Sequence, residues 1–341
     1  MQTVSKRRPG ARPGLARTNA RSRVADSGIG PDQVSYVTVG DDGAGQRLDN
    51  FLLKLAKGVP KSHIYRIVRS GEVRINRARA GASQRLAVGD RVRIPPLRLA
   101  ASNTPAARPA PVMPPILFED EHLLVVDKAA GFAVHGGSGV TFGIIEQVRS
   151  ARPNQPFLEL VHRLDRETSG ILLLAKTRRA LVALHEQLRE GKVDKRYLAL
   201  VHGTWTNARQ HVRVALRKSV TAGGERRVSA DPAGLPSHTV INLKQRFRDY
   251  TLLEAELRTG RTHQIRVHLA HLGYPIAGDD KYGDFELNKR LERGEGGPRL
   301  RRMFLHAAQI RFRHPVSDEP MDLLSPLPRD CEDFLRELAR A

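Results

Sequence analysis

The N-terminal third of the chain carries hydrophobic residues at helical spacing, followed by patterns typical of strands. Apolar residues recur at helical spacing through residues 48–55, and Gly58 follows as a stop signal. A second short helix is expected after Pro60, with Ser62 a candidate N-cap. Residues 73–76 and 90–94 then have the pattern of strands. The sequence here predicts two helices followed by a small sheet.

Strand patterns dominate the longer C-terminal part of the chain. Apolar runs at 123–126, 170–174 and 197–201 are typical of buried strands, and residues 181–188 carry a helical stripe. Strands continue as far as a helix expected to begin near residue 263. Because strands and helices do not alternate strictly and no dinucleotide-binding motif occurs, we predict an α+β fold rather than a doubly wound α/β fold.

Composition divides the chain into four segments. Residues 95–115 contain seven prolines, and such a stretch is extended and semi-rigid, as a linker is. The first residues are rich in Gly, Arg, Ser and Asp and show no sustained period, which is typical of disorder. The expected segments are a basic disordered tail at 1–44, a small basic domain at 45–98, a Pro-rich linker at 99–115 and a larger domain at 116–335.

The charge is strongly positive and unevenly distributed. The formal net charge is +21, from 57 Lys and Arg against 36 Asp and Glu. Residues 46–98 alone hold 13 Lys or Arg against three acids, a net charge of +10 in 53 residues. This concentration favours a polyanionic partner such as RNA over a generally arginine-rich composition.

Cysteine usage and hydropathy indicate in which cellular compartment the protein is expected. The single cysteine, Cys331, excludes a disulfide within the chain and a cysteine-based zinc site. No apolar run is long enough for a transmembrane helix, and the N-terminus lacks the apolar core of a secretory signal. We therefore expect a cytoplasmic protein that does not bind a membrane.

Charged residues gather at 161–170, directly before an apolar strand. Arg163 and Asp165 are two positions apart, so in extended chain they face the same side. Charges at the mouth of a buried strand are costly unless they are paired or functional, and a solvated loop with local ion pairs is the alternative. The glycines of 127–137 would let the backbone approach a ligand closely, although such a stretch is usually only a turn.

A third stretch, residues 258–271, combines a turn at Gly260 with the start of a helix that Thr262 can cap. Arg266 lies one helical turn in and can point back at a carboxylate. Three histidines in this stretch could suggest a metal site: His263, His268 and His271. Their spacing is five and three, whereas helical ligand pairs usually sit four apart, so a metal site is not favoured.

These three stretches, in this order, resemble the large pseudouridine synthase family that modifies ribosomal and transfer RNA. The resemblance runs from about residue 116 to 330. It rests on His-Arg-Leu-Asp-Arg-Glu-Thr-Ser-Gly at 162–170, Gly-Arg-Thr-His-Gln-Ile-Arg-Val-His at 260–268, and Met-Phe-Leu-His-Ala at 303–307. Residues 46–98 resemble the S4 RNA-binding module. At 127–130 this chain has Asp-Lys-Ala-Ala where relatives often have Asn-Lys-Pro, which we expect to change only loop rigidity.

The resemblance implies an S4-type domain and a catalytic domain built on a mixed, mostly antiparallel sheet. It implies an enzyme that isomerises specific uridines of 23S ribosomal RNA without a metal or energy cofactor. The sequence leaves the oligomeric state open, and we take a monomer as the default. Asp165 would be the nucleophile, Arg266 would pair with it, and Tyr197 would stack on the base and assist proton movement at carbon. Substrate-binding roles are expected for His162, Arg163, Arg261, His263, Lys61, Arg66, Arg69 and Arg74.

Two other functions compete with this interpretation. A non-catalytic RNA-binding or ribosome-assembly factor could keep the same fold, but it would not need Asp165, Tyr197 and Arg266 together. A glycoside hydrolase could use Asp165 and Glu167, but such enzymes need two carboxyl groups across a sugar and aromatic residues that stack on it. An aromatic content of 5% disfavours the hydrolase. The target uridines and the position of the covalent adduct, at sugar or base, stay open.

Overall fold

The computed structural model describes residues 33–56, 59–97, 113–136, 142–220 and 226–340. The chain divides into two units, Met1–Thr104 and Pro105–Ala341, and each unit has a hydrophobic core of its own. Among these described residues, every helix is too short or too polar to cross a membrane.

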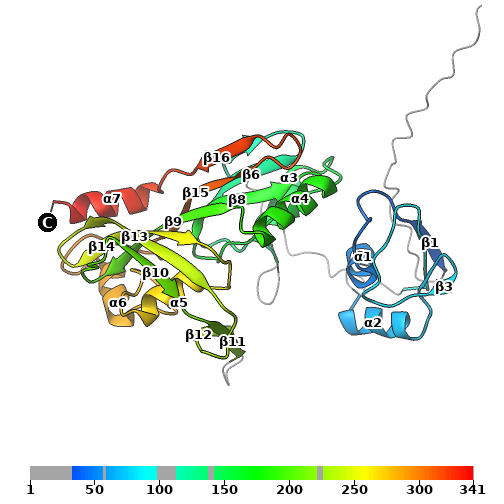
Figure 1. Ribbon diagram of the computed structural model, residues 1–341, viewed down its shortest axis with the longest axis horizontal. Helices are drawn as coiled ribbons and strands as arrows, with labels where there is room; N and C mark the ends of the chain where they lie inside the picture. Colours follow the sequence, from blue (N-terminus) through cyan, green and yellow to red (C-terminus); the bar gives the residue numbers. More distant parts are fainter. Residues whose placement is uncertain (1–32, 57–58, 98–112, 137–141, 221–225, 341) are drawn as a thin grey trace, which may run out of the picture. The chain divides into compact units, whose positions relative to one another are not determined.

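The first unit combines two helices with a four-stranded antiparallel sheet of order β1-β4-β2-β3 (Figure 1). Leu52 of the first helix, Ile67 of the second and Val92 of the sheet are fully buried in one cluster. The predicted arrangement of two helices and a small sheet is therefore confirmed. Its elements are β1 (Ser35–Thr38), α1 (Leu48–Leu55), α2 (Lys61–Arg69), β2 (Arg74–Ile75), β3 (Ala78–Arg79) and β4 (Arg91–Ile94).

Strand β1 corrects the expectation that all of residues 1–44 form a disordered tail. It pairs antiparallel with β4, and the following Val39 is buried in the core. The guanidinium of Arg91 lies 4.3 Å from the centre of the Tyr36 ring, a cation–π contact between the two strands. A four-residue alternation is too short to stand out in the sequence. Residues 1–32 of the predicted tail and 98–112 of the predicted linker region lie outside the described residues.

The second unit is built on one large sheet of order β10-β13-β14-β9-β15-β8-β6-β5, with β16 paired to β15 and β7 to β8. Only β8 and β15 pair in parallel among its described strands, which confirms the mixed, mostly antiparallel sheet. Its elements are β5 (Ile116–Glu119), β6 (Leu123–Lys128), α3 (Ile144–Ala151), β7 (Glu159–Leu160), β8 (Ser169–Ala175), α4 (Arg178–Arg189), β9 (Asp194–His202), β10 (Arg209–Arg213), β11 (Leu216–Val220), β12 (Arg226–Ala230), β13 (His238–Arg246), β14 (Tyr250–Leu257), α5 (Gln264–His271), α6 (Phe285–Arg293), β15 (Leu305–Arg313), β16 (Pro320–Leu324) and α7 (Arg329–Leu338).

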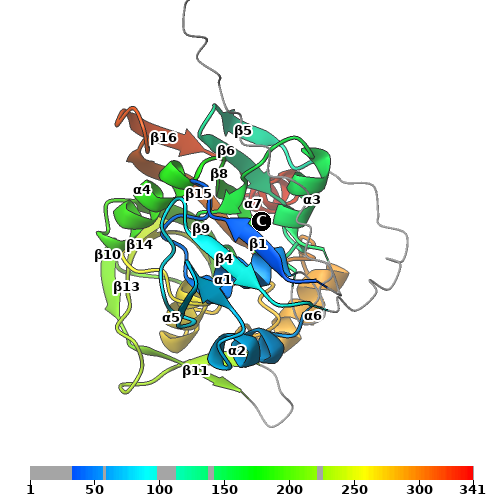
Figure 2. The same ribbon diagram turned by 90° about the vertical axis from the view of Figure 1, so that its right-hand side faces the viewer.

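Both faces of β6 and β8 are buried, which explains their continuous apolar sequences. On β8, Leu172 and Leu174 belong to the core cluster that contains α3, whereas Ile171 and Leu173 belong to the cluster that contains α4. Figure 2 shows α3 and α4 on opposite sides of these strands. A strand packed on both faces is a rigid base for the loop that precedes it, and that loop carries Asp165.

Gly170 lies where β8 meets its parallel neighbour β15. Its φ of +109° is a conformation that L side chains rarely adopt, and a Cβ built there would lie 2.3 Å from the carbonyl oxygen of Ala307. Only glycine allows the two backbones to approach so closely. Gly170 therefore sets the spacing of β8 and β15 directly after the Asp165 loop.

We expect Gly170→Ala to lower the free energy of unfolding by about 3 kcal/mol, because the new methyl group meets backbone that packing holds in place. Gly191→Ala is the control. Gly191 also has a positive φ, of +70°, but nothing lies within 4 Å of a Cβ built there, so this change should cost only about 1 kcal/mol. Denaturant unfolding of the full chain measures both. Equal losses would contradict the role assigned to the close approach.

Candidate active site

A buried lysine joins the first two stretches that the sequence analysis singled out. Lys128 has no exposed surface, and its Nζ donates to the carbonyl oxygens of Ala129, Phe132 and Arg166 at 2.8, 2.9 and 3.0 Å. Burial lowers the pKa of Lys128 to about 7. The glycine-rich stretch therefore supports the loop that carries Asp165, which gives it a structural role.

A cavity of about 370 Å³ opens beside the Asp165 loop. Most of its wall comes from that loop, from β9 and from the residues around the start of α5, three segments far apart in the sequence. All seven predicted site residues of the second unit line it: His162, Arg163, Asp165, Tyr197, Arg261, His263 and Arg266. The structure thus brings together the residues that the sequence analysis selected from separate stretches.

Arg266 contacts two carboxylates, Asp279 through two hydrogen bonds and Asp165 through a longer ion pair. Its Nε and Nη2 donate to Asp279 at 2.8 and 2.7 Å, whereas its Nη1 lies 3.6 Å from Asp165 Oδ2. Asp279 is buried, and it also accepts the backbone N–H groups of Lys281 and Tyr282. Burial alone would raise the pKa of Asp279, but Arg266 and these two N–H groups lower it below its usual value. Arg266 therefore lies at ion-pair distance from Asp165, as expected, while Asp279 accepts the two hydrogen bonds that fix its guanidinium.

Tyr197 lies in β9 between β14 and β15, with its side chain in the cavity wall. Only 7% of the residue is exposed. Burial raises the pKa of its phenol, and the negative charge of Asp165 raises it further. Within the described part of the chain its hydroxyl has no hydrogen-bond partner. A neutral phenol beside a carboxylate can therefore meet a bound ligand.

His162 and Arg163 are adjacent in sequence but have different surroundings. The backbone N–H of Leu173 donates to His162 Nε2 at 3.2 Å, and burial lowers the pKa of this histidine to about 4. His162 is therefore a neutral ring tied to β8. Arg163 is exposed at the cavity, and among the described residues no side chain or carbonyl pairs with its guanidinium. Of the two, Arg163 is the one free to contact a ligand.

The start of α5 differs from the expectation that Thr262 caps it. His263 occupies the N-cap position in the left-handed conformation, with φ +52°, and its side chain makes no capping bond. A non-glycine residue at positive φ is uncommon and often marks a functional site. His268, in turn, is buried between the hydroxyls of Ser237 and Thr239. His263 and His268 thus have different hydrogen-bond partners.

Lys195 lines the same cavity, and the sequence analysis gave it no role. It is half-buried, burial lowers its pKa, and no partner for its ammonium group occurs among the described residues. The signal that could have identified it is its position two residues before Tyr197 on one strand, because such residues share a face. It adds a cation to the cavity wall.

The four predicted RNA-contacting residues of the first unit are exposed side chains: Lys61, Arg66, Arg69 and Arg74. They lie on α2 and β2. The acid Asp49 of the same unit is almost fully buried, and hydrogen bonds from Arg47 and Tyr65 lower its pKa to about 2. The Asp49 carboxylate is thus buried, and the charges exposed on this unit are mainly positive.

Comparison with known proteins gives two family matches, an RNA pseudouridylate synthase at residues 122–271 and an S4 domain at residues 46–92. The ribosomal large subunit pseudouridine synthase C of Escherichia coli (strain K12) is 49% identical over 313 residues, which cover 90% of this chain and 98% of that protein. The enzyme of the same name from Yersinia pestis is 49% identical over 312 residues, covering 90% and 96%. This chain belongs to the RNA pseudouridylate synthase family.

A solved structure agrees with this membership. Human RNA pseudouridylate synthase domain containing 4 superposes with a TM-score of 0.54 at 25% identity, covering 66% of this chain and 92% of that chain. The family resemblance and the fold class predicted from sequence are both confirmed. The chain is an RNA pseudouridine synthase with an S4 domain at its N-terminal end.

We expect Arg266→Lys to slow pseudouridine formation about 10- to 100-fold, because an ammonium group cannot bond Asp279 in two places and also face Asp165. Release of tritium from RNA that contains [5-³H]uridine measures the rate. Arg336→Lys is the control, since Arg336 pairs with Asp333 at 2.7 Å on the surface of α7. A rate for Arg266→Lys as high as that of the control would contradict the geometry described.

Proposed function

We propose that this enzyme isomerises specific uridines of 23S ribosomal RNA to pseudouridine, with Asp165 as the nucleophile and with no metal or energy cofactor. The observation that carries the proposal is the single cavity lined by Asp165, Tyr197 and Arg266. The ribosomal large-subunit substrate rests on the named activity of the similar enzymes.

The chemistry requires no energy input. The bond between ribose C1′ and uracil N1 breaks, and a bond between C1′ and C5 forms. The C5 hydrogen leaves as a proton and N1 takes one up, so atoms and electrons balance without an oxidant or a phosphate donor. A carboxylate can form a covalent adduct and later leave it. Among the residues that line the described cavity, Asp165 is the one carboxylate.

The surrounding residues have distinct roles in this proposal. The target base leaves its stack at a cost of a few kcal/mol and enters the cavity. Tyr197 stacks on the base, and its phenol assists proton movement at C5. Arg163, an exposed and unpaired cation among the described residues, contacts the backbone phosphate of the flipped nucleotide. Arg266 and Lys195 supply positive charge around the uracil as its glycosidic bond breaks.

The arrangement of acids favours this isomerisation over glycoside hydrolysis. A hydrolase needs two carboxyl groups roughly 5–10 Å apart across the sugar. The second candidate, Glu167, does not line the cavity, and its Oε1 lies 3.4 Å from Arg166 Nε. Asp165 thus stands without a second carboxylate in the described wall.

The first unit is proposed as the RNA anchor of a monomeric cytoplasmic enzyme. Residues 46–98 carry the concentrated positive charge, and Lys61, Arg66, Arg69 and Arg74 are exposed to contact phosphates. We take residues 45–98, together with β1, as the RNA-binding domain, 99–115 as a linker and 116–335 as the catalytic domain. The single cysteine fits a reducing compartment, where the ribosomal RNA also is.

We expect Asp165→Asn to abolish turnover and to leave RNA binding within about twofold, because an amide is no nucleophile but keeps the shape of the side chain. Tritium release from [5-³H]uridine RNA measures turnover, and filter binding measures affinity. The assay contains EDTA, so that wild-type turnover also tests the absence of a metal requirement. Tritium release by the purified variant above a no-enzyme control would show that Asp165 is not the nucleophile.

Removal of the first unit should lower the affinity for RNA and the selectivity for particular uridines, but it should leave the active site intact. A chain that starts at residue 112 keeps Asp165, Tyr197 and Arg266 and the hydrophobic clusters of the second unit. Each phosphate contact releases counterions, so the slope of log affinity against log salt should become shallower.

Two measurements decide this prediction, the salt slope on a ribosomal RNA fragment and the map of pseudouridines formed. The full chain is the control in both. If the shortened chain keeps the full slope and the full site pattern, the first unit is not the anchor.

A further inference from the structure

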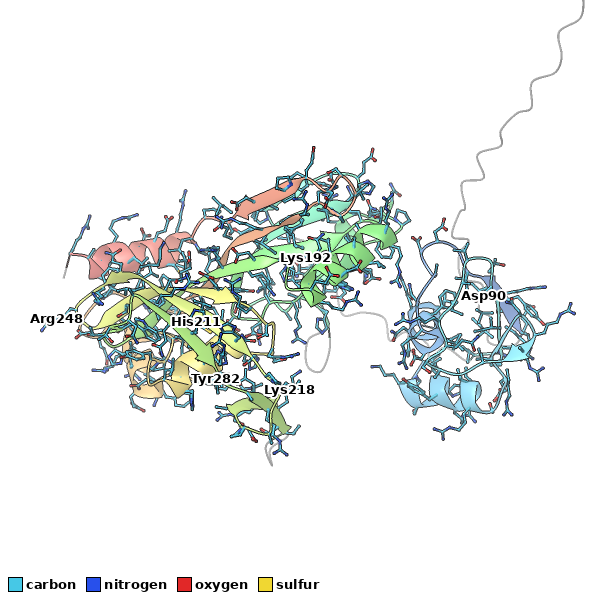
Figure 3. The ribbon with its side chains drawn as sticks, in the orientation of Figure 1. Asp90, Lys192, His211, Lys218, Arg248 and Tyr282 are labelled. Carbon is cyan, nitrogen blue, oxygen red and sulfur yellow. The ribbon has the colours of Figure 1, made fainter. Side chains whose placement is uncertain are left out.

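Tyr282, labelled in Figure 3, contacts both the β11–β12 hairpin and residues that line the cavity. Its hydroxyl lies 2.7 Å from His263 Nδ1, and it accepts the backbone N–H of Val228, on β12, at 3.1 Å. Its ring also lies 5.0 Å from the guanidinium carbon of Arg266. The hydroxyl therefore touches both the hairpin and a residue that faces the catalytic carboxylate.

The hydrogen-bond roles along this chain of groups follow from their donors and acceptors. The Tyr282 oxygen accepts the N–H of Val228, which leaves its own O–H to donate to His263 Nδ1. Burial raises the pKa of Tyr282 and lowers that of His263, so the phenol keeps its proton and the imidazole is neutral. A neutral imidazole that accepts at Nδ1 carries its proton on Nε2.

That Nε2 proton is on the side of Asp165. His263 Nε2 lies 3.8 Å from Asp165 Oδ1, while Arg266 Nη1 lies 3.6 Å from Oδ2. The two carboxylate oxygens thus face two different donors. Both distances are longer than a hydrogen bond, so a shift of about 1 Å would close them as a nucleotide enters.

The backbone conformation holds His263 where its Nε2 can face Asp165. Its left-handed φ of +52° places it ahead of the first turn of α5 rather than in it. On the other side, Val228 packs in a small hydrophobic cluster with Leu216 and with Val267 of α5, and Tyr282 packs against that cluster. The position of the hairpin is therefore coupled to the position of the Tyr282 hydroxyl.

We propose that Tyr282 and His263 are positioning residues, which hold the Asp165 carboxylate in its reactive orientation and couple that orientation to the seating of the β11–β12 hairpin. This inference rests on the proposed role of Asp165 as nucleophile. In this inference the hydrogen bond from the Tyr282 hydroxyl fixes the tautomer of His263. Other enzymes fix the tautomer of a histidine in the same way, through a hydrogen bond to its second ring nitrogen.

The test is Tyr282→Phe in the full chain, since it removes the hydroxyl and keeps the ring beside Arg266. We expect the single-turnover rate of tritium release from a [5-³H]uridine ribosomal RNA fragment to fall about 10- to 100-fold, as a displacement near 1 Å does. The Kd for the same RNA should stay within about twofold. Tyr274→Phe is the matched control. Among the described residues its hydroxyl donates to Thr204 O alone, at 3.3 Å, so this variant should keep the wild-type rate.

A spectroscopic measurement separates positioning from general structural damage. In ¹⁵N-histidine-labelled wild-type protein, the His263 ring should show the Nε2–H tautomer, assigned by its absence in His263→Gln. Tyr282→Phe should lose this single tautomer, and Tyr274→Phe should keep it. Should Tyr282→Phe fail to fold, His263→Gln is expected to show the same slow single turnover.

Three results would overturn the inference: a wild-type single-turnover rate in Tyr282→Phe, a loss confined to Kd, or a His263 tautomer that does not depend on Tyr282. The Asp165→Asn variant distinguishes this failure from that of the proposed function. If Asp165→Asn is inactive and Tyr282→Phe is fully active, the nucleophile stands and only the positioning role is wrong. An active Asp165→Asn variant would contradict both the role of Asp165 as nucleophile and the positioning role of Tyr282 and His263.

Discussion

The buried ion pair of Arg266 and Asp279 is the interaction on which the active site depends. Only 5% of Arg266 and 1% of Asp279 is exposed, and two charges taken out of water are costly unless their geometry satisfies them. Two parallel hydrogen bonds and two backbone N–H groups at Asp279 provide that geometry. Because the guanidinium plane is fixed, one edge faces Asp165 and one face lies over Tyr282. This one ion pair therefore fixes α5 relative to the turn before α6, and it holds the guanidinium of Arg266 beside Asp165.

Much of the fold is predictable because its elements bury regular faces. Helices α1 and α2 show the helical period, and β6 and β8 show continuous apolar runs because helices cover both faces of the sheet. The residues that line the cavity were also predictable in part, since Asp165 and Arg266 lie in tracts of family resemblance and the resemblance implies a role for Tyr197 as well. Lys195 follows from the same strand period once Tyr197 is placed in the cavity.

The contacts within the site depend on tertiary structure and were not predictable from residue types. Arg266 has Asp165 and Asp279 within ion-pair distance, and the turn after Gly278 decides which one it bonds twice. Thr262 has a suitable capping side chain, yet the left-handed His263 begins the helix instead. Strand β1 was missed because its partner, β4, lies more than fifty residues further along the chain.

The parallel contact between β8 and β15 has a consequence for how the enzyme matures. Leu305 of β15 lines the cavity, and β15 also forms one side of the strand that carries Tyr197. The segments that carry Asp165 and Tyr197 are synthesised well before it, and pairings between distant segments form slowly. A growing chain therefore exposes an incomplete cavity until β15 leaves the ribosome and inserts between β8 and β9.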